Sequence, residues 1–156
     1  MPLSFSEIDP AQAPLDLLLL ADPSETKVRS YLASSRCFAA FDGGAIVAAC
    51  AVQARGGGTH ELMSIAVRPG SQKSGIGTAL LEWVVGFHEK AGAARLEVGT
   101  GSFGYQLAFY QRQGFRVTAI DRDFFTTNYP EPIFEQGIRL LDMLRLTREF
   151  GSPHPS

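Results

Sequence analysis

The sequence has almost no excess charge, few cysteines and few histidines, and each shortage excludes a class of function. Its 156 residues contain 14 basic and 16 acidic side chains, for a formal net charge of −2. No cluster of Lys and Arg could neutralise a nucleic acid backbone or hold the chain on an anionic membrane. The apolar run at residues 17–21, between Asp16 and Asp22, is far too short to cross a bilayer. We therefore expect no nucleic acid or membrane partner, and a cytoplasmic location.

The two cysteines and three histidines have no arrangement that would hold a metal. Cys37 and Cys50 flank the turn Asp42-Gly43-Gly44, and a one-residue register choice decides whether they share a face of the hairpin. We expect both thiols to be buried and reduced. The histidines lack ligand spacing, and no cluster of cysteines or carboxylates joins them. The sequence thus predicts no metal site.

What is present is a strand that runs into a glycine-bearing loop and then a helix, at residues 65–80. The strand ends at Val67, Pro69-Gly70 breaks it, and a polar loop leads directly into the helix. The first N–H groups of such a helix have no partner, and the positive end of the helix dipole lies behind them. Gly75 and Gly77 carry no side chain that would block a close approach. The stretch predicts a phosphate-binding site, and an ordinary strand-to-helix turn is the alternative.

Two common phosphate motifs do not fit this loop. Gly70 and Gly75 have the separation of the GxxxxGK[ST] loop, but Ile76-Gly77 stands where Lys and Ser/Thr are required. Gly75-Ile76-Gly77 begins a dinucleotide fingerprint, but its third glycine would be Leu80. The metal–triphosphate and dinucleotide hypotheses therefore fail.

The rest of the chain predicts one domain over residues 1–150, with a disordered tail at 151–156. Strands and helices alternate only in the middle of the chain, which favours a mixed sheet with helices on both faces over a fully parallel one. We expect a helix that starts with Asp22 as N-cap and ends near Ser34. The other expected helices are 15–21 (one short turn), 75–91 and 106–113, and the expected strands are 2–8, 36–41, 45–54, 61–67, 95–98, 115–120 and 137–148, with a flexible connection at 55–59.

The loop and a second motif together resemble a known family. The spacing Gln72-x-x-Gly75-x-Gly77 resembles the coenzyme A pyrophosphate loop of the GNAT N-acetyltransferase superfamily. Residues 107–115 resemble its second signature, in which a helix ending in a Tyr, here Tyr110, meets Gly-Phe at the start of a strand. The resemblance covers residues 2–146. Within the superfamily the chain looks like a small, poorly characterised bacterial subgroup.

This resemblance implies an α+β fold with a twisted, mostly antiparallel sheet of six to seven strands, splayed in the middle. It implies direct transfer of an acetyl group from acetyl-coenzyme A to an amine. The pantetheine arm would pair with the backbone of Ile65, Ala66 and Val67. The pyrophosphate would bind at the loop, whose residues are Gln72, Lys73, Ser74, Gly75, Ile76, Gly77 and Thr78.

The sequence departs from the family pattern at two positions. Many members carry an Asn after the fifth strand that contacts pantetheine, and here Ser102 is the nearest polar residue. Many members also have a small Ala four residues before the Tyr, where this chain has Gln106. Neither change removes the phosphate loop.

Two residues are candidates for catalysis. Tyr110, with an ordinary pKa of about 10, is a suitable acid for a thiolate whose thiol has a pKa of about 8.5; the alternative is a core aromatic. Glu61 is the candidate base, directly or through a water, and in histone-type members the base has the same offset before the strand end. Alternation would place Glu61 on one face with Met63, Ile65 and Val67, where a carboxylate is costly without a task. The alternative is an exposed charge at the strand end.

The segment 121–135 suggests the acceptor. It carries four carboxylates against one Arg, interleaved with aromatic residues, and this composition suits a small cationic amine. A solvated loop, or an aromatic surface of a homodimer, are the alternatives. At the level of function, the alternative to the enzyme is a non-catalytic acyl-coenzyme A sensor or regulatory domain.

Overall fold

The computed structural model, which describes residues 3–72 and 74–151, is built on a seven-stranded sheet with the order β1-β2-β3-β4-β5-β9-β6. Neighbouring strands are antiparallel except β4 and β5, which are parallel. The predicted mixed, mostly antiparallel sheet is therefore confirmed. Its strands are β1 (Leu3–Ile8), β2 (Arg36–Asp42), β3 (Ala45–Gly56), β4 (Thr59–Val67), β5 (Arg95–Gly101), β6 (Arg116–Asp121) and β9 (Met143–Glu149).

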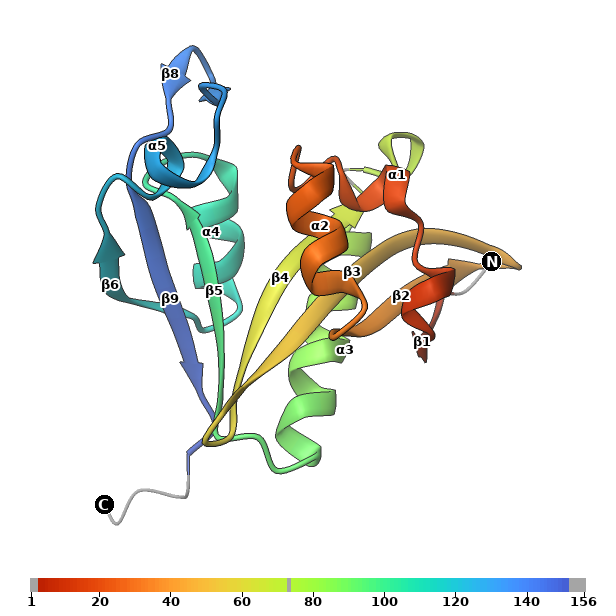
Figure 1. Ribbon diagram of the computed structural model, residues 1–156. Coiled ribbons are helices and arrows are strands. Elements are labelled where there is room, and N and C mark those ends of the chain that lie inside the picture. The colour runs from red at the N-terminus through yellow and green to blue at the C-terminus, as the bar shows by residue number, and fades with distance from the viewer. Residues whose placement is uncertain (1–2, 73, 152–156) are drawn as a thin grey trace.

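Helices cover both faces of the sheet, as predicted (Figure 1). On one face, α1 (Leu15–Leu18) and α2 (Glu25–Leu32) bury Leu17 and Val28 against small residues of β3. On the other face, α3 (Ile76–Lys90) buries Leu80 and Val84 against the core that also contains Tyr110 of α4 (Tyr105–Arg112). Each helix presents one apolar stripe to the sheet. The sheet thus separates two apolar cores.

The sheet opens between β4 and β5. These strands pair only from Thr59–Leu62 to Arg95–Val98, and beyond that point they diverge, which Figure 1 shows as a wedge between the two halves of the sheet. Along this stretch, the edges of the two strands that face each other lack a neighbouring strand. Backbone N–H and C=O groups on such an edge need other partners.

Met63 lies in a β-bulge next to this opening. Ala51 is paired with Ser64 and Val52 with Leu62, so Met63 is one extra residue in β4. A bulge of this kind reverses the alternation of side chains after it.

The bulge corrects one prediction made from alternation. Met63 packs with the core under α1 and α2, and Glu61 lines a cavity on that same side. Ile65 and Val67 pack instead with the core under α3. The four side chains do not share a face, because the extra residue sends the two pairs to opposite sides.

Other element boundaries also differ from the predictions. The N-cap of α2 is Ser24, whose Oγ accepts from the N–H of Lys27, while Asp22 Oδ1 accepts from the N–H of Ser24. The expected flexible connection at 55–59 is mostly strand, since β3 reaches Gly56 and β4 begins at Thr59. The expected tail lies outside the described residues except for Gly151.

The C-terminal third contains more and shorter helices and strands than the sequence predicts. The segment expected to be one long strand contains β8 (Ile138–Arg139) and β9, and β8 forms a small separate sheet with β7 (Phe134–Glu135). Before them, the acidic insertion folds into the short helix α5 (Phe124–Asn128). Short 3-10 turns occur at Pro10–Gln12 and Pro69–Ser71.

Both cysteines are free and buried, as predicted, and they belong to different cores, Cys37 under α1 and α2 and Cys50 under α3. None of the helices in the described part of the chain is long and apolar enough to span a bilayer.

Candidate active site

A cavity of about 420 Å³ lies where the end of β4 meets the start of α3; we call it the α3 cavity. Its walls come from the α1–α2 connection, the end of β4, the glycine loop and α4. It is lined by Leu20, Ala21, Ile65, Ala66, Val67, Ser71, Gln72, Gly75, Ile76, Gly77, Thr78, Tyr105, Gln106, Phe109 and Tyr110. Most residues of the predicted cofactor site therefore come together around one space.

The loop gives this cavity a floor of backbone amides. Gly75 is the N-cap of α3 with φ of 80°, a left-handed conformation that favours glycine, and no side chain among the described residues caps the helix. The N–H groups of the first helical turn thus have no acceptor within the helix. A side chain at Gly77 would begin 3.2 Å from Cγ2 of Val67, so glycine lets the helix approach the strand. The arrangement suits an anionic group.

The polar residues of the loop have different placements. Gln72 lines the cavity, and its Nε2 donates to the carbonyl of Val67 at 3.1 Å, so this side chain ties the loop to β4. Ser74 is exposed, does not line the cavity, and donates its Oγ–H to the carbonyl of Ser71. Lys73 lies outside the described residues.

The predicted contact of Ser102 is not part of this arrangement. Ser102 is exposed and does not line the α3 cavity, so its role stays a prediction. Gln106, one helical turn before Tyr110, lines the cavity instead, and its Oε1 lies 3.5 Å from the hydroxyl of Thr100. Gln106 is thus a polar side chain of α4 that lines this cavity.

Tyr110 stands at the wall of the α3 cavity in an apolar environment. It is buried, and the rings of Phe109 and Phe115 meet it edge to face, with centroids 5.2 and 5.8 Å away. Burial raises the pKa of Tyr110 well above its ordinary value, and the nearby Cys50 thiol adds to the effect. The hydroxyl therefore keeps its proton at neutral pH.

A second cavity, of about 350 Å³, opens on the other face of the sheet; we call it the α2 cavity. It is lined by Asp22, Lys27, Ser30, Tyr31, Gln53, Arg55, Glu61, Leu62, Met63, Gly99, Phe124, Tyr129, Met143 and Arg145. Along β4 the lining of the α2 cavity ends at Met63 and that of the α3 cavity starts at Ile65. Only Ser64 separates the two.

Glu61 is held in the α2 cavity by two arginines. Arg55 donates from Nε to Oε1 at 2.9 Å, and Arg145 donates from Nη1 to Oε2 at 3.0 Å. Arg145 also donates from Nη2 to Oδ2 of Asp121 at 3.5 Å. Both oxygens of the candidate base are thus engaged by guanidinium groups.

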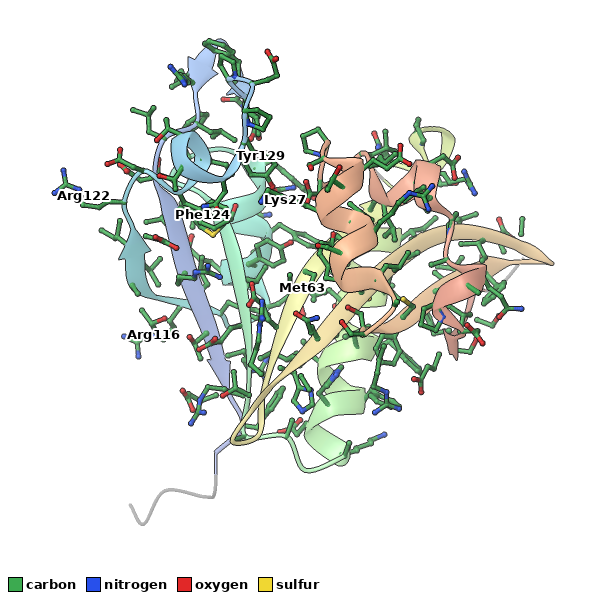
Figure 2. The ribbon with its side chains drawn as sticks, viewed as in Figure 1. Lys27, Met63, Arg116, Arg122, Phe124 and Tyr129 are labelled. Carbon is green, nitrogen blue, oxygen red and sulfur yellow. The ribbon has the colours of Figure 1, made fainter. Side chains whose placement is uncertain are left out.

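Tyr129 closes the α2 cavity on the side of α5. Its hydroxyl donates to Oδ1 of Asp22 at 3.1 Å, and Nζ of Lys27 lies 5.1 Å from its ring centroid. Figure 2 shows Lys27 and Tyr129 reaching toward each other from opposite sides of the wedge, with Phe124 beside Tyr129. Burial, and next the charge of Asp22, raise the pKa of Tyr129, so this bridge stays protonated and intact at neutral pH.

The acidic insertion contributes aromatic rings to the cavity more than charge. Phe124 and Tyr129 line it, whereas none of the four carboxylates of segment 121–135 does. Asp121 reaches it only through Arg145. Sequence reasoning missed Lys27, Arg55 and Arg145, because each stands in an element that shows no motif.

No group of three or more potential metal ligands occurs among residues 3–72 and 74–151.

The comparisons with known proteins point to one family. The chain matches a family model described as "Acetyltransferase (GNAT) domain" over residues 33–117. It is 42% identical over 132 residues to the uncharacterized N-acetyltransferase YvbK of Bacillus subtilis (strain 168), a match that covers 84% of this chain and 85% of that protein.

Two solved structures resemble it closely. An IAA acetyltransferase from Bacillus cereus ATCC 14579 aligns with a TM-score of 0.89 and 39% identity, over 95% of this chain and 99% of that one. A GNAT family acetyltransferase from Elizabethkingia anophelis with acetyl-CoA bound aligns with a TM-score of 0.88 and 38% identity, over 94% of this chain and 97% of that one.

Proposed function

The chain belongs to the GNAT acetyltransferase family, and we propose that it moves an acetyl group from acetyl-coenzyme A directly to a primary amine of a small molecule. Its relatives are named N-acetyltransferases, and one of the similar structures contains acetyl-CoA. As a member of this family the chain is an acyltransferase. The donor, the acceptor and the residue roles are the proposal.

The observation that carries the proposal is that one residue of β4, Ser64, separates the linings of two cavities on opposite faces of the sheet. The bulge at Met63 and the divergence of β4 from β5 both occur at this point of the strand. A donor in one cavity and an acceptor in the other would approach each other through the opening in the sheet. Bringing two reactants together in this way lowers the entropic barrier to their reaction.

The α3 cavity fits acetyl-coenzyme A in the chemistry of its walls. The amide groups at the start of α3 would bind the pyrophosphate, with Gly75 and Gly77 allowing close approach. The edge of β4 at Ile65, Ala66 and Val67 would pair with the amides of pantetheine, because no strand of the sheet occupies it. Lys73, Ser74 and Ser102 stay predicted contacts.

Acetyl-coenzyme A supplies a thioester whose carbonyl carbon an amine can attack. Transfer forms the N–C bond and breaks the C–S bond, so the nitrogen must lose a proton and the sulfur must gain one. Tyr110 would donate the proton to sulfur, because its raised pKa keeps the hydroxyl protonated. Product and free thiol then form in equal amounts.

Glu61 has two candidate roles, as the catalytic base and as a residue that positions two arginines. Its carboxylate would accept the proton of the amine, directly or through a water. Both oxygens already accept from Arg55 and Arg145, however, so Glu61 would also serve to position these guanidinium groups. The two roles differ in their effect on turnover and on acceptor affinity.

The predicted small cationic acceptor rested on Glu61 and on the acidic insertion. An amine is protonated when it arrives at neutral pH, so the proposal keeps a positively charged amine group in the acceptor. A cavity of about 350 Å³ suits a small molecule.

The test is acetyl transfer with a panel of small primary amines. We expect acetyl-coenzyme A to stabilise the protein against heat, and thiol release to match the amount of N-acetylated product measured by mass spectrometry. Binding of acetyl-coenzyme A without thiol release above the amine-free rate, for every amine, would contradict the proposal and favour the acyl-coenzyme A sensor.

A further inference from the structure

We infer that the acceptor carries a carboxylate beside its amine, and that Lys27, Arg55 and Arg145 bind this carboxylate in the α2 cavity. The inference rests on the proposed function, since it names the class of acceptor for the same site. It differs from the sequence-based prediction in the charge of the acceptor: a molecule with both groups is a zwitterion, of the chemistry of an amino acid.

The charged groups that line the α2 cavity favour an anion. Three are cationic, Lys27, Arg55 and Arg145, and two are carboxylates, Asp22 and Glu61. Hydrogen bonds from within the protein engage both carboxylates. Glu61 accepts from two arginines, and a single oxygen of Asp22 accepts from the Tyr129 hydroxyl and from the N–H of Ser24.

The guanidinium groups are more accessible than the carboxylate that holds them. The side chains of Arg55 and Arg145 are 44% and 30% exposed, whereas that of Glu61 is 13% exposed. Each guanidinium has five N–H donors, and these contacts use only some of them. A solute in the cavity would therefore meet N–H donors, and guanidinium geometry matches a carboxylate.

Lys27 adds a third cation to the lining of the cavity. Its ammonium group lies over the ring of Tyr129 and forms no ion pair within the described residues 3–72 and 74–151. A ring face holds a cation without neutralising its charge. The position leaves the three donors of this group open to an incoming anion.

Two buried hydroxyls beside the cavity are candidates for holding the amine. Tyr31 lines the α2 cavity and Ser64 follows its lining along β4, and the two residues are 7% and 5% exposed. Their hydroxyls lie near each other, and neither finds a hydrogen-bond partner of ordinary length among the described residues. A buried hydroxyl without a partner is costly, so an amine beside these two would stabilise them. Because Ser64 stands between the linings of the two cavities along β4, such an amine would face the donor side.

These contacts define both ends of the acceptor. The amine would lie at Tyr31 and Ser64, and the carboxylate at the three cations. Between them, Met63 and Phe124 supply apolar wall, which suits an acceptor with an apolar or aromatic side chain.

The test compares amino acids with their amides and with the amines that lack the carboxylate, for example phenylalanine, phenylalaninamide and phenethylamine. We expect kcat/KM to be about 10- to 100-fold higher for the carboxylated member of at least one such set, as for a hydrogen-bonded charge pair. Lys27→Gln should raise KM for that amino acid about tenfold, leave KM for its amide unchanged, and leave KM for acetyl-coenzyme A unchanged. Lys90→Gln, which removes the same charge from the exposed end of α3, is the matched control.

A binding measurement separates this inference from the proposed function. Calorimetry with the protein saturated with coenzyme A measures the affinity of each amino acid and of its amide without any turnover. Affinity for an acid that exceeds that for its amide, and that is lost in Lys27→Gln but kept in Lys90→Gln, supports the inference even if no acetyl transfer occurs. Efficient transfer to the amides and decarboxylated amines, with equal or better binding than the acids, overturns the inference and leaves the proposed function standing. Absence of binding by any acid also overturns it.

Discussion

The α3 cavity and the α2 cavity are made in different ways. The first takes its chemistry from the backbone of one continuous stretch, from the end of β4 through the glycine loop into α3. The second takes its chemistry from side chains of α2, β3, β4 and β9 and from the segment around α5. A backbone site is specified by local sequence, whereas a side-chain site depends on the whole fold. The two should therefore respond differently to substitution.

The largest effect should come from Tyr110, where the α3 cavity uses a side chain rather than backbone. Tyr110→Phe should slow turnover by roughly 10²- to 10⁴-fold, the usual loss for a proton donor, while KM for acetyl-coenzyme A stays unchanged. Single-turnover kinetics and calorimetry measure the two effects.

The pH profile gives a second readout for Tyr110. Burial raises its pKa above 10.0, so the protonated, donating form persists through pH 7 to 10 and is lost only above that range. The wild-type rate should show no decline from this group within that range. A Phe variant with full turnover, chemistry being rate-limiting, would reduce Tyr110 to a packing residue.

In the α3 cavity, the backbone that would bind the pyrophosphate should be most sensitive to a substitution of Gly75. Gly75→Val should weaken acetyl-coenzyme A binding by about 10- to 100-fold, as for the loss of one or two charge-assisted hydrogen bonds, because it alters the backbone where the pyrophosphate would bind. Calorimetry measures the affinity.

Gly92 supplies a matched control for Gly75. Its φ is 87°, close to the 80° of Gly75, and an added Cβ meets no atom within 4 Å at either position. Gly92→Val should therefore have a comparable backbone cost but normal affinity. Equal affinity in the two variants would show that the loop does not bind the pyrophosphate.

A substitution of Glu61 tests whether this residue positions the arginines of the α2 cavity. If Glu61 positions Arg55 and Arg145, Glu61→Gln should raise the acceptor's KM by about tenfold and change kcat little. If it is the base, kcat should fall by roughly 10²-fold or more. Steady-state kinetics, with KM for acetyl-coenzyme A as the internal control, distinguishes these outcomes.

The smallest effect should come from Tyr129. Tyr129→Phe removes the hydrogen bond to Asp22 but keeps the ring beneath Lys27, so the acceptor's KM should rise only about two- to fivefold, consistent with one hydrogen bond of about 0.5–1 kcal/mol. Tyr129→Leu also removes the ring and should have the larger effect. Equal KM values for both variants and the wild type would mean that this bridge does not shape the acceptor site.

Sequence patterns predicted the α3 cavity better than the α2 cavity. Glycine spacing and strand-to-helix order identified the loop, and most predicted contacts line one space, with Ser102 and Ser74 outside it. For the α2 cavity the sequence supplied Glu61 and the aromatic insertion, whose carboxylates do not line it. The basic residues that line the cavity, such as Arg55 and Arg145, belong to no local pattern that distinguishes them.

By itself, the sequence determined the mixed sheet, the helices on its two faces and the glycine loop, because turn residues, helix starts and apolar periodicity act over a few neighbouring residues. Only the tertiary structure decided which way Glu61 points and which residues surround it. One extra residue at Met63 reverses the alternation of β4, and the pairing of β5 with β9 brings Arg145 to the opening. Both depend on register between strands distant in sequence, so the physical origin of the acceptor site lies in long-range pairing.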